Sequence, residues 1–217
     1  MITIPSLNCR DTQCVREKSR IVSGIDAPWV HIDVADGEFA PVVLAEDAEA
    51  VMRILEEERY QGYVEVHFMV TRPETRVRAW LERGAKRIIV HAETLPGPDA
   101  LKILKSECEI FGAELGVAVH AETPTDVIKP FLGKAEFWTI LSVPIGFSGG
   151  IFKEEASLRM LSFLRTHGPK IIIEIDGGMR EDTGLRVKNA GADIIVSGSF
   201  IFSHEDPTRA FHILENL

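Results

Sequence analysis

Trp29-Val30-His31-Ile32-Asp33-Val34 (WVHIDV, 29–34) is a short β-branched, apolar run that carries two chemically active side chains. Comparable apolar runs recur at nearly even intervals along the chain. They predict strands at 2–5, 29–34, 63–68, 87–91, 114–119, 137–142, 171–176 and 193–197. Because these runs are almost continuously apolar, they are typical of a parallel sheet that is covered on both faces.

The segments between these runs have helical periodicity and contain better helix-forming residues. We expect helices that include 42–58, 73–83, 97–110, 153–166 and 181–190. Eight strands that alternate with about eight helices, without a linker or a shift in composition, predict one α/β domain over residues 1–217. A doubly wound sheet fits this pattern too, but the strand count and the chain length favour a (β/α)8 TIM barrel.

Composition limits the partners of the protein. The net charge is −9 and no basic cluster occurs, which argues against a nucleic-acid partner. The N-terminal residues lack the pattern of a signal peptide, and no run approaches the roughly 18 apolar residues of a membrane span. The odd number of cysteines (Cys9, Cys14 and Cys108) shows no metal-binding spacing, so we expect free thiols in a reducing cytoplasm.

Polar side chains stand where the predicted strands end, at Ser6, His31, Asp33, His67, His91, His120 and Asp176. Barrel closure would bring these strand ends to one mouth, where active sites of such barrels lie. His31, Asp33, His67 and Asp176 form a plausible ligand set for one divalent ion, and Zn, Fe, Mn or Co suits imidazole with carboxylate. Each histidine taken singly is also consistent with a structural role.

Asp33 and Asp176 also suggest acid–base chemistry. If they lie on opposite faces of a substrate, one can remove a proton from carbon next to a carbonyl while the other returns a proton from the opposite face. The result is inversion at carbon through an enediolate. The alternative is that both aspartates only cap loops.

Glycine-rich loops follow the last three predicted strands. They are Gly146-Phe147-Ser148-Gly149-Gly150, Gly177-Gly178 and Gly198-Ser199. In barrels the loops after strands 7 and 8 are a frequent phosphate site, because backbone N–H groups can approach the anion. Tight turns without a ligand are the alternative.

These residues resemble the ribulose-phosphate 3-epimerase family from Ile4 to Phe202. The matching pieces are Pro5-Ser6-Leu7, HIDVADGEFAP (31–41), VEVHFMV (64–70), IIVHAET (88–94), GVAVHAETP (116–124), GFSGG (146–150), IEIDGG (173–178) and GADIIVSGSFIF (191–202). The resemblance implies a (β/α)8 barrel isomerase that acts on a phosphorylated ketose with one divalent metal ion. Members are commonly dimers or hexamers, so it also implies a homo-oligomer.

The resemblance assigns roles to residues of this chain. His31, Asp33, His67 and Asp176 correspond to the metal ligands, and the two aspartates also correspond to the acid and base. The positions that correspond to substrate and phosphate contacts are Ser6, Met69, Gly146, Gly149, Gly177, Gly178, Gly198 and Ser199.

The surroundings of this set depart from the family pattern at Ala35, Val42, His120, Leu141, Ser148 and Gly150. Methionine is usual at the positions of Ala35 and Leu141, so Ala35 should leave room for a different or larger sugar phosphate. The segments PSLNCRD (5–11) and HFMVTRP (67–73) resemble the allulose-6-phosphate 3-epimerases, which act on a hexulose phosphate.

Two other functions compete with a ketose-phosphate 3-epimerase. Decarboxylases and synthases of the same barrel group carry Asp-x-Lys-x-x-Asp after a strand, and the comparable Asp33-Val34-Ala35-Asp36 has no lysine. A non-catalytic barrel that binds a sugar phosphate is the second competitor, but a binding module needs no paired acid and base.

Overall fold

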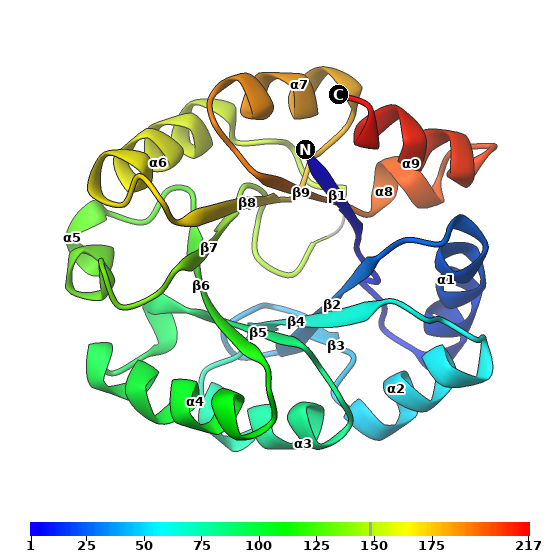
Figure 1. Ribbon diagram of the computed structural model, residues 1–217, viewed down its shortest axis with the longest axis horizontal. Coiled ribbons are helices and arrows are strands. Elements are labelled where there is room, and N and C mark those ends of the chain that lie inside the picture. Colours follow the sequence, from blue (N-terminus) through cyan, green and yellow to red (C-terminus); the bar gives the residue numbers. More distant parts are fainter. Residues whose placement is uncertain (148) are drawn as a thin grey trace.

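Eight parallel strands enclose the centre of the molecule in the computed structural model (Figure 1). The structure describes residues 1–147 and 149–217, so Ser148 lies outside the described residues. Within them the parallel strands are β1 (Ile2–Pro5), β2 (Trp29–Asp36), β4 (Tyr63–Met69), β5 (Arg87–His91), β6 (Glu114–His120), β7 (Phe137–Leu141), β8 (Ile172–Asp176) and β9 (Ile194–Ser197). Each lies within two residues of a predicted strand.

The strands close into a barrel. From β2 through β9 each parallel strand pairs with the next one in the chain, and β9 pairs with β1. Between β1 and β2 the N–H of Leu7 donates to the carbonyl of His31 at 2.7 Å, next to a parallel bridge between Ser6 and His31. The expected (β/α)8 architecture is therefore confirmed, and the carboxyl ends of the strands meet at one mouth.

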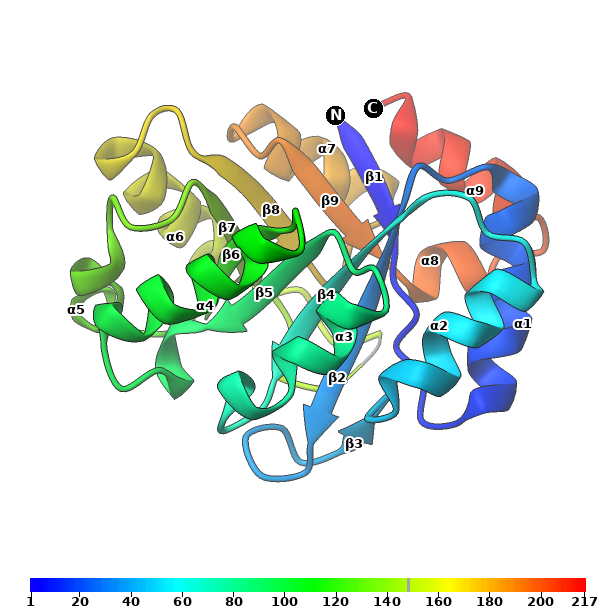
Figure 2. The same cartoon turned by 60° about the horizontal axis from the view of Figure 1, so that its bottom comes forward.

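Helices surround the barrel, as Figure 1 shows, and α2, α3 and α4 lie in front of the strands in Figure 2. The helices are α1 (Thr12–Ile25), α2 (Ala48–Glu57), α3 (Val77–Glu82), α4 (Pro98–Ile110), α5 (Thr125–Ile128), α6 (Glu154–His167), α7 (Glu181–Asn189), α8 (Ser199–Phe202) and α9 (Pro207–Glu215). Short 3₁₀ turns lie at Pro73–Thr75, Ala92–Thr94 and Lys129–Phe131. Of the helices in the described ranges, none is long and apolar enough to cross a bilayer.

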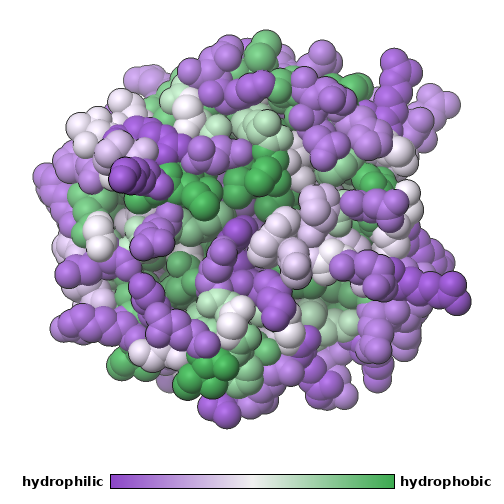
Figure 3. All heavy atoms as spheres, in the orientation of Figure 1, coloured by the Kyte–Doolittle hydropathy of each residue, from purple (hydrophilic) through white to green (hydrophobic). Residues whose placement is uncertain are grey.

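Alternation along each strand separates the main core from the barrel interior. On β2, Val30, Ile32 and Val34 are fully buried in the large core between strands and helices. Their neighbours His31 and Asp33 point to the opposite face, into the barrel, because side chains alternate along a strand. The outer surface is hydrophilic over most helices, while hydrophobic side chains gather over β8, β9 and β1 on the face in Figure 3.

The predicted helix at 42–58 is wrong at its beginning. Val43–Leu44 instead form the short strand β3, which pairs antiparallel with Ala35 and Asp36 at the end of β2. The helix α2 begins only at Ala48. The apolar residues before it continue a helical pattern in the sequence, but in the fold Leu44 and Val42 pack in one apolar cluster with Met69 and Leu141.

The expectation of three free thiols is also wrong. Cys9 and Cys14 form a disulfide, and Cys108 is free and buried. The side chain of Asp11 caps the beginning of α1 by accepting from the N–H of Cys14 at 2.8 Å. This tight turn brings the two Cα atoms to 5.6 Å, within the range that a disulfide requires.

Candidate active site

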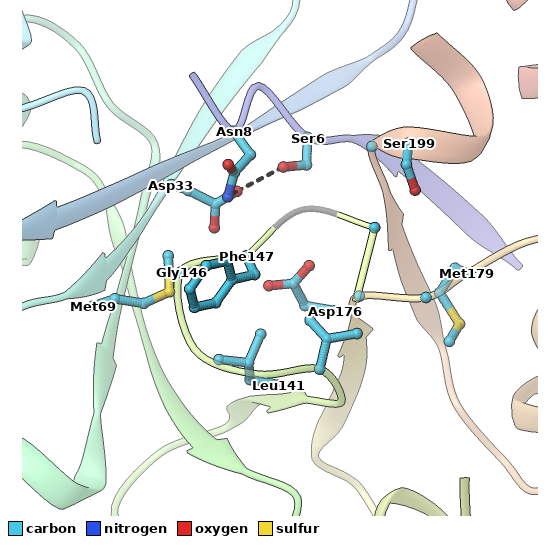
Figure 4. A pocket seen from close by; sticks show the side chains of 15 residues that line it. Ser6, Asn8, Asp33, Met69, Leu141, Gly146, Phe147, Asp176, Met179 and Ser199 are labelled. Carbon is cyan, nitrogen blue, oxygen red and sulfur yellow. Dashed lines mark hydrogen bonds between the residues drawn. The ribbon is translucent and has the colours of Figure 1, made fainter. Parts of the chain in front are cut away.

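A pocket opens at the carboxyl end of the barrel (Figure 4). It is lined by Ser6, Asn8, Asp33, Met69, Leu141, Val143, Gly146, Phe147, Gly149, Asp176, Gly177, Gly178, Met179, Gly198 and Ser199. All the predicted site residues line it except His31 and His67, which are fully buried. The structure therefore brings together segments that lie far apart in the sequence.

Four side chains from three strands converge beneath the floor of this pocket. The Nε2 atom of His31 lies 3.4 Å from Oδ1 of Asp33 and 3.8 Å from Oδ2 of Asp176. The Nδ1 atom of His67 lies 3.5 Å and 3.3 Å from the same two oxygens. One donor atom from each residue lies within 4.8 Å of the others.

Strand register produces this convergence. Asp33 on β2 stands directly opposite His67 on β4. His31 lies two residues before Asp33 and therefore faces the same side of the strand. Asp176 ends β8, which lies apart from β2 and β4 in the strand order, so barrel closure brings its carboxylate to the two histidines.

The four residues fit a metal ion. Both converging histidine nitrogens, Nε2 of His31 and Nδ1 of His67, are buried and lack a hydrogen-bond partner among the described residues. A buried nitrogen left without a partner is costly, whereas a cation would accept the lone pairs of both rings. Two imidazoles with two carboxylates are a donor set that divalent transition metals accept.

Electrostatics in this cluster favour charged side chains. Burial alone would lower the pKa of His31, but Asp33 and Glu65 outweigh it and raise that pKa well above its ordinary value. Burial would raise the pKa of Asp33, and the two histidines hold it well below its ordinary value instead. The carboxylate of Asp33 is therefore ionised, and a metal ion must compete with protons for His31.

Two polar side chains from the segment after β1 fix the other oxygen of Asp33. The hydroxyl of Ser6 donates to Oδ2 of Asp33 at 2.7 Å, and the amide of Asn8 donates to it at 3.2 Å. Figure 4 shows both residues above Asp33, on the opposite side of the pocket from Asp176. The two carboxylates thus approach the pocket from different strands and different sides.

A second layer of charged side chains lies inside the barrel beside His31. Glu65 is fully buried and accepts from Nδ1 of His31 at 2.7 Å, while Arg87 donates to its other oxygen at 2.5 Å. Glu174 accepts from the hydroxyl of Thr139 at 2.8 Å. Burial and the nearby Glu65 raise the pKa of Glu174 well above its ordinary value.

His31, Glu65 and Glu174 also lie close enough to form a second three-residue group. Because both oxygens of Glu65 are already held by His31 and Arg87, this layer is a set of internal ion pairs and hydrogen bonds. Within the described residues, Oε2 of Glu174 is the atom of this layer without a partner, whereas on the pocket floor two histidine nitrogens lack one.

A second histidine contacts His67 from the side away from Asp33 and Asp176. The Nε2 atoms of His67 and His91 lie 2.9 Å apart, and Nδ1 of His91 lies 3.0 Å from Oε2 of Glu93. Burial lowers the pKa of His91, so this ring is neutral. His91 and His120 end strands as predicted, but neither lines the pocket.

The turn after β8 has a backbone that requires glycine. Gly177 has a φ of +96°, and a Cβ atom there would lie 2.4 Å from Cγ2 of Val143. The hydroxyl of Ser142 lies 2.6 Å from the carbonyl oxygen of Asp176 and 2.7 Å from that of Gly177. These contacts fix the glycine turn beside the aspartate and leave its backbone facing the pocket.

The space expected beside Ala35 is filled. Ala35 is fully buried in an apolar cluster with Leu44 and Met69, and it does not line the pocket. The β3 segment causes this, because Leu44 stands directly opposite Ala35. Leu141, the other departure from the usual methionine, does line the pocket.

Sequence reasoning missed several residues of this region: Asn8, Val143, Phe147 and Met179 in the pocket, and Glu65, Arg87, Glu93 and Glu174 around it. A signal for two of them is present in the sequence. Glu65 precedes His67 by two residues and Glu174 precedes Asp176 by two, so each shares a strand face with a site residue.

The chain is similar to known proteins over nearly its whole length. Residues 2–202 match the ribulose-phosphate 3 epimerase family. The ribulose-phosphate 3-epimerase of Aquifex aeolicus is 34% identical, with 93% of this chain and 90% of that protein covered. That of Synechocystis sp. is 30% identical, with 100% and 94% covered.

Solved structures show the same fold at lower sequence identity. The 3-hexulose-6-phosphate synthase from Salmonella typhimurium superimposes with a TM-score of 0.75 at 15% identity, covering 100% of this chain and 97% of that one. The orotidine 5′-monophosphate decarboxylase from Sulfolobus solfataricus gives a TM-score of 0.64. With a family match over residues 2–202 and these two relatives matched over at least 90% of their length, the chain belongs to the ribulose-phosphate 3-epimerase family and is an isomerase.

Proposed function

We propose that this protein is a metal-dependent epimerase that inverts C3 of a phosphorylated ketose, with ribulose 5-phosphate and xylulose 5-phosphate as its substrate pair. One observation carries the proposal. Two buried histidine nitrogens, which have no hydrogen-bond partner in the part of the chain that the structure describes, face one oxygen each of Asp33 and Asp176, beneath a pocket that both aspartates line.

His31, Asp33, His67 and Asp176 would hold one divalent ion, of Zn, Fe, Mn or Co. Bound there, the ion would draw electron density from the oxygens of the ketose and so make the proton on C3 more acidic. Family membership and the buried cluster together support a divalent metal as the cofactor.

Asp33 and Asp176 would carry the protons. In one direction the ionised carboxylate of Asp33 takes the C3 proton, and the electron pair left on carbon is delocalised into the neighbouring carbonyl as an enediolate. Asp176, holding a proton, then donates it to C3 from the opposite face. The product is inverted at C3, Asp33 ends protonated and Asp176 ionised, so the reverse reaction exchanges their roles.

Neutral groups would bind the phosphate. Because the chain has a net charge of −9, a phosphorylated substrate depends on local donors for its attraction. Three backbone segments line the pocket, with Gly146, Gly149, Gly177, Gly178, Gly198 and Ser199. Backbone N–H groups of such loops are the phosphate ligands of many barrels, and Ser6 and Met69 would contact the sugar.

A hexulose phosphate of the allulose 6-phosphate type is the second candidate substrate. It is favoured by Leu141, which lines the pocket where the family more often has the longer and more flexible methionine. Ala35 no longer supports it, because its side chain is packed under Leu44.

The test is an epimerase assay on ribulose 5-phosphate and allulose 6-phosphate, with and without a chelator, combined with deuterium incorporation at C3 in D₂O. We expect exchange at C3 that requires metal. Asp33→Asn and Asp176→Asn should each reduce turnover by about 10²- to 10⁴-fold with the fold intact by circular dichroism. Near-native turnover in either variant would refute the two-carboxylate mechanism.

Asp36→Asn is the matched control. Its carboxylate lies three residues beyond Asp33, accepts from the N–H of Thr71 at 2.7 Å, and does not line the pocket. It should retain activity. Absence of C3 exchange across both sugar phosphates would instead favour a barrel that binds a sugar phosphate without catalysis.

A further inference from the structure

We propose that Glu65 and Glu93 are positioning residues that determine which ring nitrogen of each histidine faces the metal, so that His31 binds through Nε2 and His67 through Nδ1. The two carboxylates act through separate hydrogen-bond chains, one that ends on His31 and one that ends on His67. This inference rests on the proposed metal site, and it concerns residues outside the set of four ligands.

The first chain fixes His31. Nδ1 of His31 donates to Oε1 of Glu65, which leaves Nε2 as the nitrogen that faces Asp33 and Asp176. Glu65 cannot turn away, because Arg87 holds its second oxygen at 2.5 Å.

Arg87 is itself immobilised. Its guanidinium lies 4.3 Å from the ring centre of Trp29 and 4.0 Å from that of Phe137, and its Nε donates to Glu114 at 2.8 Å. Stacking between two aromatic rings keeps the guanidinium plane fixed. The orientation of the His31 ring is therefore anchored in the barrel interior, away from the pocket.

The second chain fixes His67 through a neutral ring. A hydrogen bond between two imidazole nitrogens needs one donor and one acceptor, and the contact between the Nε2 atoms of His67 and His91 is 2.9 Å. If Nδ1 of His67 offers its lone pair to a cation, the ring proton is on Nε2 and His91 must accept it. The proton of His91 is then on Nδ1, from which it is donated to Glu93 at 3.0 Å.

Glu93 ends this chain and sets its direction. Its other oxygen accepts from the N–H of His120 at 2.8 Å and from the hydroxyl of Thr123 at 2.6 Å. An ionised carboxylate held by these donors can only accept from Nδ1 of His91, so the proton positions in both rings follow from it. Such outer carboxylates commonly orient histidine ligands and strengthen metal binding.

Glu174 provides a matched control. It is as deeply buried as Glu65 and points into the same interior, but it accepts its hydrogen bond from Thr139, and no histidine ring lies within hydrogen-bond distance of it in the described part of the chain. The structure therefore assigns different consequences to Glu65→Gln and Glu174→Gln, although each replaces one buried glutamate side chain with its amide.

The first experiment uses native protein loaded with Zn²⁺, which is diamagnetic, and measures the histidine side chains by ¹⁵N NMR. We expect protons on Nδ1 of His31, Nε2 of His67 and Nδ1 of His91, with a scalar coupling across the hydrogen bond between the Nε2 atoms of His67 and His91. Any other protonation pattern, or absence of this coupling, would overturn the inference.

The second experiment measures Co²⁺ affinity by chelator competition together with the visible spectrum of the bound ion. His91→Phe and Glu65→Gln should each weaken binding by about 10- to 100-fold and change the spectrum, while Glu174→Gln should bind as the native protein does. His91→Gln, whose amide oxygen can accept the same proton, should restore most of the affinity lost in His91→Phe.

The outcomes separate the two proposals. If His91→Phe and Glu65→Gln both bind Co²⁺ with native affinity, the positioning role is overturned and the metal site is not. Failure of the native protein to bind either ion would overturn the metal site and the positioning role together. If a variant does not fold, the NMR measurement still tests the proton positions on the three histidine rings, because it uses native protein.

Discussion

We expect Glu93 to make a large contribution to stability that disappears in acid. Its side chain is 16% exposed and accepts three hydrogen bonds, from His91, the N–H of His120 and the hydroxyl of Thr123. Burial alone would raise the pKa of Glu93, but these donors outweigh it and lower the pKa from 4.5 to about 2. The folded protein therefore stabilises the ionised form of Glu93 more than the unfolded chain does.

The magnitude follows from linkage. A shift of about 2.5 pKa units, at about 1.4 kcal/mol for each unit, gives about 3 kcal/mol of stability at neutral pH. Because the pKa is lowered in the folded state, this stability is present above the unfolded pKa and is lost as the pH falls through the folded pKa. The contribution of Glu93 should be about 1.4 kcal/mol at pH 3 and nearly absent at pH 2.

Urea denaturation of native protein and Glu93→Gln between pH 2 and pH 7, both treated with a chelator, tests this. The free energies of unfolding should differ by about 3 kcal/mol near pH 7 and converge in acid. Glu46→Gln is the control, because its carboxylate pairs with Arg76 at 2.9 Å on the exposed surface and should contribute less than about 1 kcal/mol. A difference that does not vary with pH would refute the reasoning, because it would show a steric effect of the amide.

Three further predictions concern stability. Gly177→Ala should destabilise the protein by about 2 kcal/mol or more, through the positive φ and the close approach to Val143. Gly24→Ala should not, because within the described residues a Cβ atom there would have nothing within 4 Å beyond its chain neighbours and the backbone of its own helix; equal urea midpoints for the two variants would contradict this. Ala35→Met should lower the free energy of unfolding by about 1–3 kcal/mol, because the fully buried site has no room for the longer side chain. An unchanged melting temperature would show that the site does have room. In metal-free protein the contribution of His31 to stability should be fully present below about pH 6.5 and be lost as the pH rises through the raised pKa of His31, whereas metal-loaded protein should not show this loss. Thermal melts of both forms above about pH 6.5 test this, and a metal-free protein that becomes more stable as the pH rises would contradict it.

The strands could be predicted because their cause is local. Each is an apolar, β-branched run bounded by glycine or polar residues, and eight such runs in a chain of this length leave few architectures. The beginning of the helix predicted at 42–58 could not be placed, since Val43 and Leu44 fit a helical pattern equally well. Their pairing with β2 is a tertiary effect that overrides local preference.

The pocket residues could be predicted where they end strands, but the layer below them could not. Glu65 lies in the middle of an apolar run, and nothing local indicates that its partner is His31 on the neighbouring strand. Strand register supplies that information, since His31 stands directly opposite Glu65. The cysteine prediction was wrong for the opposite reason: pairing of Cys9 with Cys14 depends on a local turn that an odd cysteine count conceals.

The barrel interior accommodates so many ionisable groups because it balances charge layer by layer. In the lower layer the negative charge of Glu65 is matched by Arg87, whose guanidinium is held between two aromatic rings. In the upper layer the carboxylate of Asp33 is matched by protonated His31 when no metal is bound, and a divalent ion would take the place of that proton. Arg87 already neutralises Glu65. The negative charge that a bound cation has to balance is therefore that of Asp33 and Asp176 on the pocket floor. A cation bound there would complete the charge balance beside the pocket that Asp33 and Asp176 line.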